Sequence, residues 1–407
     1  MSEPDQVFFQ EWDARAPGER RSLARARALL GAAGLDSPGP PVLTVVGSKG
    51  KGTAAVYASA YLCAAGRRVV TVTSPSLWRT TERIRVDGVP VDEATLAALG
   101  DRLAALRPGR TAGAGYLSPS GLFLLAGLVH ARDVAADAVV LEAGKGGRSD
   151  EVSLVDPTVV AVAPIFAEHL GELGGSVEAV VADKLGVVRP RTRAVVIGTQ
   201  PEPTWRRIRD RVAAQTGGAL TPVEAAADPA AGAVGSDLLP PGLGAANARL
   251  GCVAASHLLA AAPPAAALRR VLGTVRLPGR LSRHRLPGTE LVVDAAVDRT
   301  GVAAAVRYAR TWLGGIDHVL LSLPDDKDLA GAAASLHGLP VTAVTLPAGH
   351  LTYRRPVPPG WSRVRVSEVD RAFVAARGPR VLALGTVTFV AHVLRLAGAD
   401  PAVAFRR

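Results

Sequence analysis

Residues 41–73 read PVLTVVGSKGKGTAAVYASAYLCAAGRRVVTVT, and the interpretation of the whole chain starts from this stretch. The apolar run over 41–46 is typical of a buried strand, and an alanine-rich helix is expected over 54–65, closed by Gly66. A second strand is expected over 68–73. A strand, a glycine-rich loop, a helix and another strand in succession favour a parallel sheet.

The loop between the first strand and the helix reads GSKGKGT over residues 47–53. Glycines let main-chain N–H groups turn toward phosphate oxygens, and the following helix N-terminus adds partial positive charge. Lys51 is expected to contact the β- and γ-phosphates, and the Thr53 hydroxyl to ligate Mg²⁺. Gly52 separates these two residues, so the loop is a variant of the usual phosphate-binding pattern. An ordinary glycine-rich turn is the alternative, and the strand-loop-helix context favours nucleotide binding.

Alternating strands and helices continue to the end of the chain, and the pattern restarts near residue 278. Residues 216–241 are rich in Ala, Gly and Pro and look least ordered. We expect an α/β protein: a P-loop parallel-sheet ATPase domain over 1–278, then a smaller Rossmann-like α/β domain over 279–407. Further strands are expected over 137–141, 158–163, 194–198, 291–293, 318–323, 341–346 and 381–385. Helices are expected over 11–35, 122–131, 176–185, 245–262, 329–337 and 389–397.

Composition excludes several classes of protein. Of the 407 residues, 48% are hydrophobic and 20% charged, which is typical of a globular chain with a core and not of a disordered one. Two cysteines, Cys63 and Cys252, can make neither a disulfide framework nor a four-ligand zinc site. No apolar run approaches the about 20 residues of a membrane helix, and the first residues lack the apolar core of a signal peptide. A cytoplasmic protein that does not bind membranes is expected.

The basic balance has a compositional explanation. The formal net charge is +11, with 47 Lys and Arg against 36 Asp and Glu. Only five of these cations are lysines (49, 51, 145, 184 and 327), which leaves 42 arginines, as GC-rich codon usage would produce. The arginines are spread along the chain without aromatic interleaving, so no nucleic-acid partner is expected. A lysine kept in such a chain points to chemistry that a guanidinium cannot perform.

The loop and its flanks also resemble a known family. Residues 44–53 resemble the T-x-G-T-N-G-K-G-S loop of folylpolyglutamate and dihydrofolate synthases, within the Mur ligase superfamily. The resemblance runs from about residue 42 to about residue 390, and an ordered series of motifs is more specific than one motif. The other matching segments, in the family's order, are 73–77 (TSPSL) with 82–85 (ERIR), 141–150 (LEAGKGGRSD), 168–169 (EH), 183–187 (DKLGV), and 278–280 (PGR) with 294–298 (DAAVD).

The resemblance implies an ATP-dependent amide-bond ligase of the ADP-forming kind. In that family a carboxylate takes the γ-phosphoryl group to become an acyl phosphate, and an amine then displaces phosphate. Such phosphoryl transfer depends on positioning and charge neutralisation. The implied cofactors are ATP and Mg²⁺. The implied partners are a small-molecule carboxylate and an amine, which includes amino acids, and a monomer is expected.

Site residues carry over by matching position. Glu142 and His169 would ligate Mg²⁺, with Thr53 and Ser74 near the metal. Lys184 matches a lysine that the family carbamylates, and the carbamate would hold a second Mg²⁺. Three of these residues have a structural alternative. Glu142 could cap a turn, His169 could be a surface histidine, and Lys184 could interact with a helix dipole.

The nucleotide contacts carry over in the same way. Asn247 matches an asparagine near the adenine, Arg280 a hinge arginine on the γ-phosphate side, and Asp294 an interdomain acid that contacts nucleotide. An N-cap, a surface arginine and a strand-end acid are the structural alternatives. The resemblance assigns catalysis to Lys51, Lys184, His169 and Arg280. It assigns nucleotide binding to Gly47, Lys49, Gly50, Lys51, Gly52, Thr53, Asn247, Arg280 and Asp294.

Several family residues are replaced. The family's His of T-S-P-H-L is Ser76, its Asn before E-R-I is Thr81, an acid is replaced by Gly121, and its C-terminal His and Asn are Val297 and Asp298. The ATP and metal positions are mostly kept, so we expect a divergent ligase that joins a different acid and amine. The alternatives are a housekeeping folate synthase, a small-molecule P-loop kinase, and a nucleotide-binding protein without catalysis.

Overall fold

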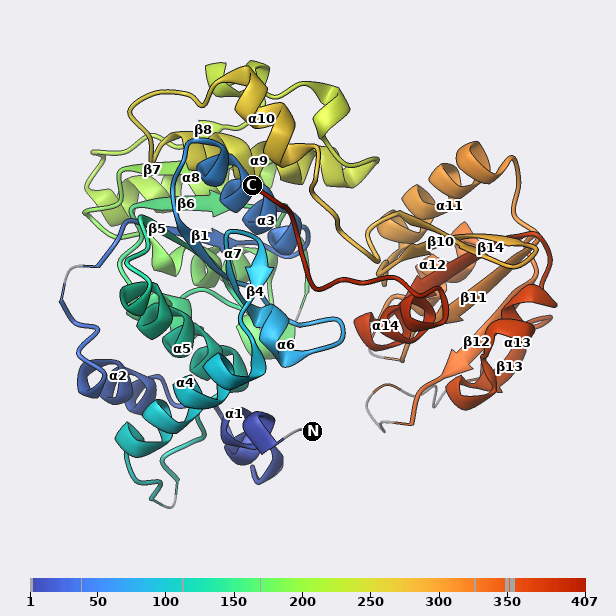
Figure 1. Ribbon diagram of the computed structural model, residues 1–407, viewed down its shortest axis with the longest axis horizontal. Helices are drawn as coiled ribbons and strands as arrows, with labels where there is room; N and C mark the ends of the chain where they lie inside the picture. The colour runs from blue at the N-terminus through green and yellow to red at the C-terminus, as the bar shows by residue number, and fades with distance from the viewer. Residues whose placement is uncertain are drawn as a thin grey trace. The chain divides into compact units, whose positions relative to one another are not determined.

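The computed structural model describes residues 3–37, 39–111, 113–168, 170–325, 327–347, 351 and 356–407 (Figure 1). The chain forms two compact units. The first comprises Met1–Leu239, Ala245–Val275 and Ala402–Arg407, and the second comprises Pro240–Gly244 and Arg276–Pro401. The boundary expected between residues 278 and 279 lies close to the start of the long segment of the second unit.

The first unit is built on an eight-stranded sheet in the order β4-β3-β2-β5-β1-β6-β7-β8. Strands β2, β5, β1, β6, β7 and β8 are parallel, and β3 and β4 add an antiparallel edge. The parallel sheet expected from the sequence is therefore confirmed. Its strands are β1 (Val42–Val46), β2 (Val69–Val72), β3 (Ile84–Val86), β4 (Val89–Pro90), β5 (Ala138–Glu142), β6 (Val159–Val162), β7 (Ala194–Ile197) and β8 (Val223–Glu224).

Helices cover this sheet and bury its apolar strands. Helix α3 packs on β1, β2 and β5, and α5 packs on β2 and β5 (Figure 1). All residues of β1, β2, β6 and β7 are buried, as expected for strands covered on both faces. The helices are α1 (Glu3–Asp13), α2 (Leu23–Ala32), α3 (Lys51–Ala64), α4 (Glu93–Leu106), α5 (Pro119–Asp133), α6 (Leu170–Leu173), α7 (Val177–Lys184), α8 (Glu202–Thr216), α9 (Leu243–Ser256) and α10 (Ala265–Leu272).

The single helix expected over 11–35 is wrong. The chain instead forms α1 and α2, separated by a turn in which Gly18 adopts φ +79°. Pro17 stands before that glycine, and this pair ends helical geometry more strongly than the arginine-rich periodicity sustains it. The two helices are joined by a buried ion pair, with 2.6 Å between Arg25 Nη1 and Glu11 Oε2.

The second unit has its own six-stranded sheet, in the order β13-β12-β11-β14-β10-β9. The strands are parallel except β9, which runs antiparallel to β10 along one edge. Helices α11 and α14 pack on β10 and β14. The elements are β9 (Ser282–Leu286), β10 (Thr289–Asp294), α11 (Arg299–Leu313), β11 (His318–Ser322), α12 (Leu329–Ser335), β12 (Val341–Thr345), β13 (Ser362–Arg365), α13 (Arg371–Ala375), β14 (Arg380–Gly385) and α14 (Val387–Leu396).

Short 3₁₀ helices occupy connections between these elements. The segment over 216–241 contains β8 and two of them. The 3₁₀ helices are η1 (Thr80–Arg83), η2 (Glu151–Leu154), η3 (Leu185–Val187), η4 (Pro229–Ala233), η5 (Ser236–Leu238) and η7 (Val366–Glu368).

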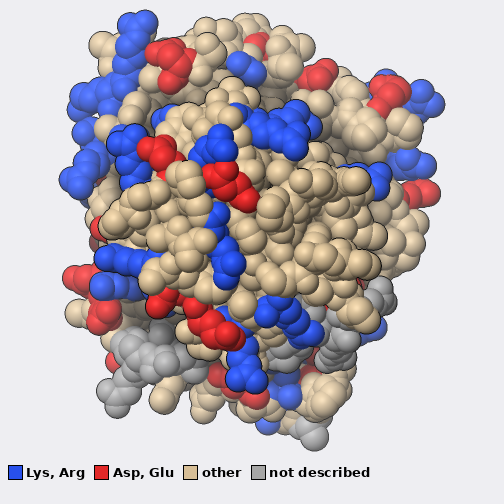
Figure 2. Space-filling view, turned by 90° about the vertical axis from the view of Figure 1, so that its right-hand side faces the viewer, with Lys and Arg blue, Asp and Glu red and all other residues tan. Residues whose placement is uncertain are grey.

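Two surface properties bear on the class of protein. On the face shown in Figure 2, basic groups lie among acidic and uncharged ones and do not form one continuous strip. Within the described ranges, no helix combines the length and the apolar character that crossing a bilayer requires.

Candidate functional site

The order of the first sheet places several loops at one edge. Strand β1 lies between β5 and β6, and β2 lies next to β5. Because these strands are parallel, the loops that follow their carboxyl ends meet at the same edge, which is where open α/β sheets bind ligands. The loops in question are 47–50, 73–79, 143–150 and 163–168, and they contain most of the predicted site.

The glycine-rich loop follows β1 directly and opens α3. Gly50 is the N-cap of α3 and adopts a left-handed conformation, with φ +82° and ψ −1°. Gly47 has φ +140°, and a Cβ there would lie 2.7 Å from the Ala163 carbonyl oxygen. Both positions therefore require glycine, because each has a positive φ and each leaves too little space for a Cβ. Ser48 N donates to the Pro164 carbonyl oxygen at 2.8 Å, so the N–H groups that favour an anion here are those of the first turn of α3.

The polar side chains of this loop are held in defined places. Lys51 Nζ donates to the Gly47 carbonyl oxygen at 3.0 Å, so its amine folds back over the loop. Ser48 Oγ donates to Phe166 O at 3.3 Å and accepts from Phe166 N at 3.2 Å, which ties the loop to the segment after β6. Thr53 is buried on the first turn of α3, whereas Lys49 is exposed.

Glu142 is brought against the loop from the end of β5. A Cβ at Gly52 would lie 3.4 Å from Glu142 Oε2, an ordinary van der Waals contact, so this carboxylate lies directly beside the first turn of α3. The same oxygen accepts a hydrogen bond from Ser74 N at 3.0 Å. The Ser74 hydroxyl in turn accepts from Arg83 Nη1 at 3.1 Å. The structure thus gathers Glu142, Ser74 and the turn that carries Thr53.

These groups fit a magnesium ion in their chemistry. A carboxylate and two hydroxyls are oxygen donors, and Mg²⁺ is usually held by one or two carboxylates together with phosphate and water oxygens. His169, the other expected metal ligand, lies outside the described residues. Within the described part of the chain, no three His, Cys, Asp or Glu side chains group as a complete metal cage. The oxygen donors of Glu142, Thr53 and Ser74 therefore suit an ion that binds together with a phosphate-bearing ligand.

Lys184 lies beneath the loop with its side chain fully buried. Its Nζ donates to Gly47 O at 2.9 Å, to Lys145 O at 2.9 Å and to Glu168 Oε1 at 3.0 Å. Burial lowers the pKa of this amine, and the nearby Lys51 charge lowers it further, while Glu168 acts in the opposite direction. Three donors therefore meet three acceptors, which connects the phosphate loop to the loops after β5 and β6.

This environment bears on the carbamate that the resemblance implies. An ammonium group has three N–H donors and no acceptor, which matches two carbonyl oxygens and a carboxylate. A carbamate would present negative oxygens to those same acceptors. In the arrangement described, the three acceptors fit the unmodified amine and do not fit the carbamate. Carbamylation of Lys184 stays a prediction.

Asn247 reaches the loop from α9. A Cβ at Gly50 would lie 2.2 Å from Asn247 Cγ, so the amide occupies the space that the glycine leaves. Position 247 is distant in sequence from the loop, and the local residue pattern does not predict the contact between Asn247 and Gly50. The structure therefore brings Asn247 together with Gly50.

Arg280 and Asp294 belong to the second unit and are described within it. Asp294 ends β10, and its Oδ2 accepts a hydrogen bond from Leu281 N at 2.7 Å. Burial raises the pKa of this carboxyl to about 6, and the neighbouring Arg280 guanidinium opposes that rise. Arg280 itself is exposed. Their roles toward a nucleotide stay predictions.

A buried acidic network, which the sequence reasoning missed, lies beside the loop after β5. Glu151 fills the space next to Gly121, where a Cβ would lie 2.5 Å from Glu151 Cγ. Its carboxylate accepts from Ser118 Oγ at 2.6 Å and pairs with Arg21 Nη1 at 2.8 Å. Asp150 pairs with the same guanidinium at 3.1 Å. A carboxylate thus stands beside the position where the family's acid is absent, contributed by a different segment.

Two available signals could have indicated this network and the role of Glu168. Asp150 and Glu151 form an acidic pair directly after a glycine-rich segment, and Glu168 follows β6 at the same sheet edge. Strand-end acids in α/β folds commonly line sites. Glu151 pairs with an arginine, and burial raises the pKa of the Glu151 carboxyl. A sequence alone does not show that burial.

Comparison with known proteins finds relatives that share one description. The chain is 28% identical over 365 residues to a dihydrofolate synthase/folylpolyglutamate synthase of Mycobacterium tuberculosis, covering 80% of this chain and 74% of that protein. It is 35% identical to the Escherichia coli protein of the same description over 178 residues, 44% of this chain and 40% of that one. No family model matches the chain.

Solved structures show the same fold. Folylpolyglutamate synthase of Mycobacterium tuberculosis complexed with ADP superposes with a TM-score of 0.81 and 22% identity, covering 98% of this chain and all of that one. The bifunctional folylpolyglutamate synthase/dihydrofolate synthase of Yersinia pestis, complexed with AMPPNP and Mn ion, gives a TM-score of 0.79 and 24% identity, covering 97% and 98%. The expected fold class, two α/β domains with a P-loop in the first, is confirmed.

Proposed function

Because the chain is a relative of the folylpolyglutamate and dihydrofolate synthases, we propose that it is an ATP-dependent, ADP-forming ligase that joins a small-molecule carboxylate to an amine through an acyl phosphate. The relatives' descriptions and the ADP and AMPPNP complexes of the solved neighbours support this proposal. The observation that carries it is local: the Glu142 carboxylate lies against Gly52 and accepts from Ser74 N at 3.0 Å.

Each residue has a task in this proposal. Main-chain N–H groups at the N-terminus of α3 bind the phosphates, and the Lys51 amine neutralises charge on them. Glu142, Thr53 and Ser74 hold a divalent ion, which when bound polarises the phosphate oxygens. Lys184 ties the loop to its neighbours and so holds Gly47 in place. Asn247, Arg280 and Asp294 contribute further nucleotide contacts, and His169 a metal contact, as the resemblance implies.

We infer that the acid and amine differ from those of the relatives. Ser76, Thr81, Val297 and Asp298 replace polar family residues. Glu151 and Arg21 bury an ion pair beside Gly121, so charge is distributed differently there. Substrate specificity depends on such groups, because a buried polar side chain left without its partner strongly disfavours the wrong ligand.

A phosphate-release screen over carboxylates and amines, with ATP, Mg²⁺ and mass spectrometry of the product, tests the proposal. We expect release that requires both an acid and an amine, and a product heavier than the acid by the amine minus water. Lys51→Ala should lower the rate by at least about 100-fold, since it removes a charge from the phosphates. Lys145→Ala is the matched control, because its exposed amine pairs with Glu172 at 2.9 Å and should leave the rate unchanged.

The alternatives predict different results. Turnover with dihydropteroate or tetrahydrofolate and glutamate, with complementation of a strain lacking the folate enzyme, would identify a housekeeping synthase and contradict the different substrate pair. A stable phosphorylated product formed without an amine would identify a kinase. ATP binding without turnover under any acceptor would contradict catalysis altogether.

A further inference from the structure

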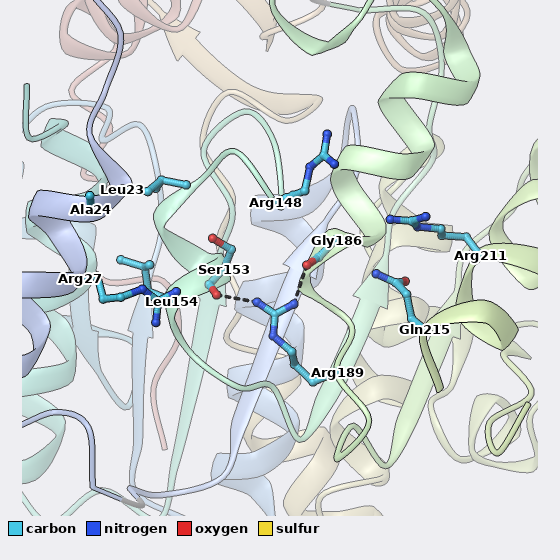
Figure 3. Close-up of a pocket in the computed structure, with 10 residues that line it drawn as sticks. All are labelled: Leu23, Ala24, Arg27, Arg148, Ser153, Leu154, Gly186, Arg189, Arg211 and Gln215. Carbon is cyan, nitrogen blue, oxygen red and sulfur yellow. Dashed lines mark hydrogen bonds between the residues drawn. The ribbon is translucent and has the colours of Figure 1, made fainter. Parts of the chain in front are cut away.

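A pocket rich in arginine opens in the first unit, outside the site described above. It has a volume of about 360 Å³ and is lined from α2, η2, η3 and α8 and from the loop residues Arg148 and Arg189 (Figure 3). Among the described residues, those lining it include four arginines and no acidic side chain; the arginines are Arg27, Arg148, Arg189 and Arg211. A concave surface of this size that gathers cationic groups is suited to a small anionic ligand.

Two of these guanidinium groups have no counter-charge in the part of the chain that the structure describes. Arg27 is exposed on α2, and Arg211 extends from α8 on the other side of the pocket (Figure 3). Neither makes a hydrogen bond or an ion pair with a described residue. The planar fork of a guanidinium matches the oxygen geometry of phosphate and carboxylate, so both heads are available to an oxyanion.

Arg211 and Gln215 add a second, independent sign. Arg211 Nε and Gln215 Oε1 are both buried without a hydrogen-bond partner within the described ranges. They are four residues apart on α8, so they share one helix face, and both line the pocket. Buried polar atoms are usually satisfied, and a ligand in the pocket would give these two atoms a partner, since both residues line it. The Gln215 amide can also turn to present its N–H₂ group.

The other two arginines are partly engaged, and Arg189 forms the fixed part of the pocket. Arg189 donates through Nη1 to Gly186 O and through Nη2 to Ser153 O, both at 2.7 Å (Figure 3). Its Nε lies 3.5 Å from the exposed Asp156 carboxylate. Arg148 Nε lies 3.8 Å from Asp183 Oδ1, with 69% of the arginine side chain exposed.

The Asp183 carboxylate is already occupied inside the protein. It accepts from Gly147 N at 3.0 Å, from Ser149 N at 3.1 Å and from Ser149 Oγ at 2.9 Å. Its charge therefore offsets only part of the cationic charge around the pocket. Asp156, the other nearby acid, has 69% of its side chain exposed and is screened by solvent.

We propose that this pocket binds a small anion that carries at least two negative charges on oxygen atoms, held by Arg27, Arg211 and Gln215 against the rigid Arg189. Polyphosphates and di- or tricarboxylates share this chemistry. The ligand is distinct from a nucleotide in the phosphate loop, since none of the loop residues 47–53 lines the pocket. The inference does not depend on the ligase proposal.

Calorimetric titration of the full-length protein with inorganic tripolyphosphate and, separately, with citrate tests the proposal and distinguishes the two sources of oxyanion. We expect at least one of them to bind in low salt and to weaken as salt rises, with one site in this pocket and any second tripolyphosphate site in the phosphate loop. Arg211→Gln and Arg27→Gln should each weaken binding by about 10-fold or more, as loss of a charge-assisted contact does. Arg209→Gln is the matched control on α8, because Arg209 is exposed beside Asp210 and does not line the pocket.

Lys51→Ala separates this pocket from the phosphate loop. Binding that persists in Lys51→Ala and is lost in Arg211→Gln belongs to the pocket. Binding that is lost in Lys51→Ala and kept in Arg211→Gln and Arg27→Gln would overturn the proposal, as would no binding of either probe at millimolar concentration. If Arg211→Gln fails to fold by circular dichroism, the exposed Arg27→Gln carries the test.

Discussion

Lys184 Nζ donates a hydrogen bond to the Gly47 carbonyl oxygen at 2.9 Å, so the last residue of α7 fixes the first residue of the phosphate loop. The same amine also holds the loops after β5 and β6 through Lys145 O and Glu168. One cation therefore sets the relative positions of three loops that follow neighbouring parallel strands.

Lys184→Ala should lower the free energy of unfolding by about 3 kcal/mol, because it leaves buried acceptors without their donor. Urea unfolding measures this loss. The Lys184→Ala substitution should also reduce the rate of phosphate release. A small alkylammonium ion should restore part of that rate if the native group is an ammonium. Restoration by acetate instead would show that the group acts as an anion, as a carbamate would. Lys145→Ala again serves as the control, because the contact from Lys184 is to its main chain.

Gly50→Ala and Gly66→Ala form a matched pair. Both glycines have positive φ, +82° and +80°, so alanine should cost each about 1 kcal/mol of stability. A Cβ at Gly50 also meets Asn247 at 2.2 Å, whereas at Gly66 there is nothing within 4 Å. We expect Gly50→Ala to melt at the lower temperature, because the Asn247 amide must move, and to lose most ATP turnover, whereas Gly66→Ala keeps its turnover. Equal turnover in the two variants would contradict a role for the close approach of Asn247.

Gly121 and Glu151 should be strongly coupled in a double-mutant cycle. Gly121→Ala places a methyl group 2.5 Å from Glu151 Cγ and should lower the free energy of unfolding by about 1–3 kcal/mol. In a Glu151→Ala background that clash is gone, and alanine is a better helix former than glycine, so the same change should be neutral or stabilising. Additive effects in urea unfolding would show that Glu151 does not occupy the space beside Gly121.

The pH dependence of stability should report on Asp294. Its pKa is raised to about 6 by burial, whereas an aspartate in an unfolded chain titrates near about 4. Between these values the folded state keeps a proton that the unfolded state has lost, so the free energy of unfolding falls as pH rises from about 4 to about 6. The contribution is about 3 kcal/mol.

Asp294→Asn should remove this part of the slope, because the amide has no charge to bury and can still accept from Leu281 N. Denaturant unfolding of the full chain at several pH values compares the two proteins. An unchanged slope in the variant would show that Asp294 titrates normally in the folded state.

The parallel sheet and phosphate loop could be predicted because their signals are local. Apolar runs of strand length, a glycine-rich loop and an alanine-rich helix over residues 41–73 leave few other arrangements. Edge strands β9 and β13 read SRHRL and SRVR, and their charged residues hide them from a search for apolar runs. Only pairing with β10 and β12 shows them to be strands.

The site was predictable in its residue types and less so in its contacts. Glu142 and Lys184 could be named from motifs, yet the three acceptors around Lys184 Nζ depend on how three loops pack. Glu151 was missed for the same reason, since its partner Arg21 is 130 positions away in the chain. Long-range packing of charged groups leaves no periodic trace in a sequence.

The scarcity of lysine gives the protein a small set of nucleophilic amines. Lys184 is shielded completely, while Lys49 and Lys51 lie in the phosphate loop and Lys145 on the next loop. An amine-directed acylating reagent therefore has few side chains to modify. Peptide mapping of the modified chain would make Lys49 and Lys51 intrinsic reporters of occupancy, protected when a ligand covers the phosphate loop and labelled when it leaves.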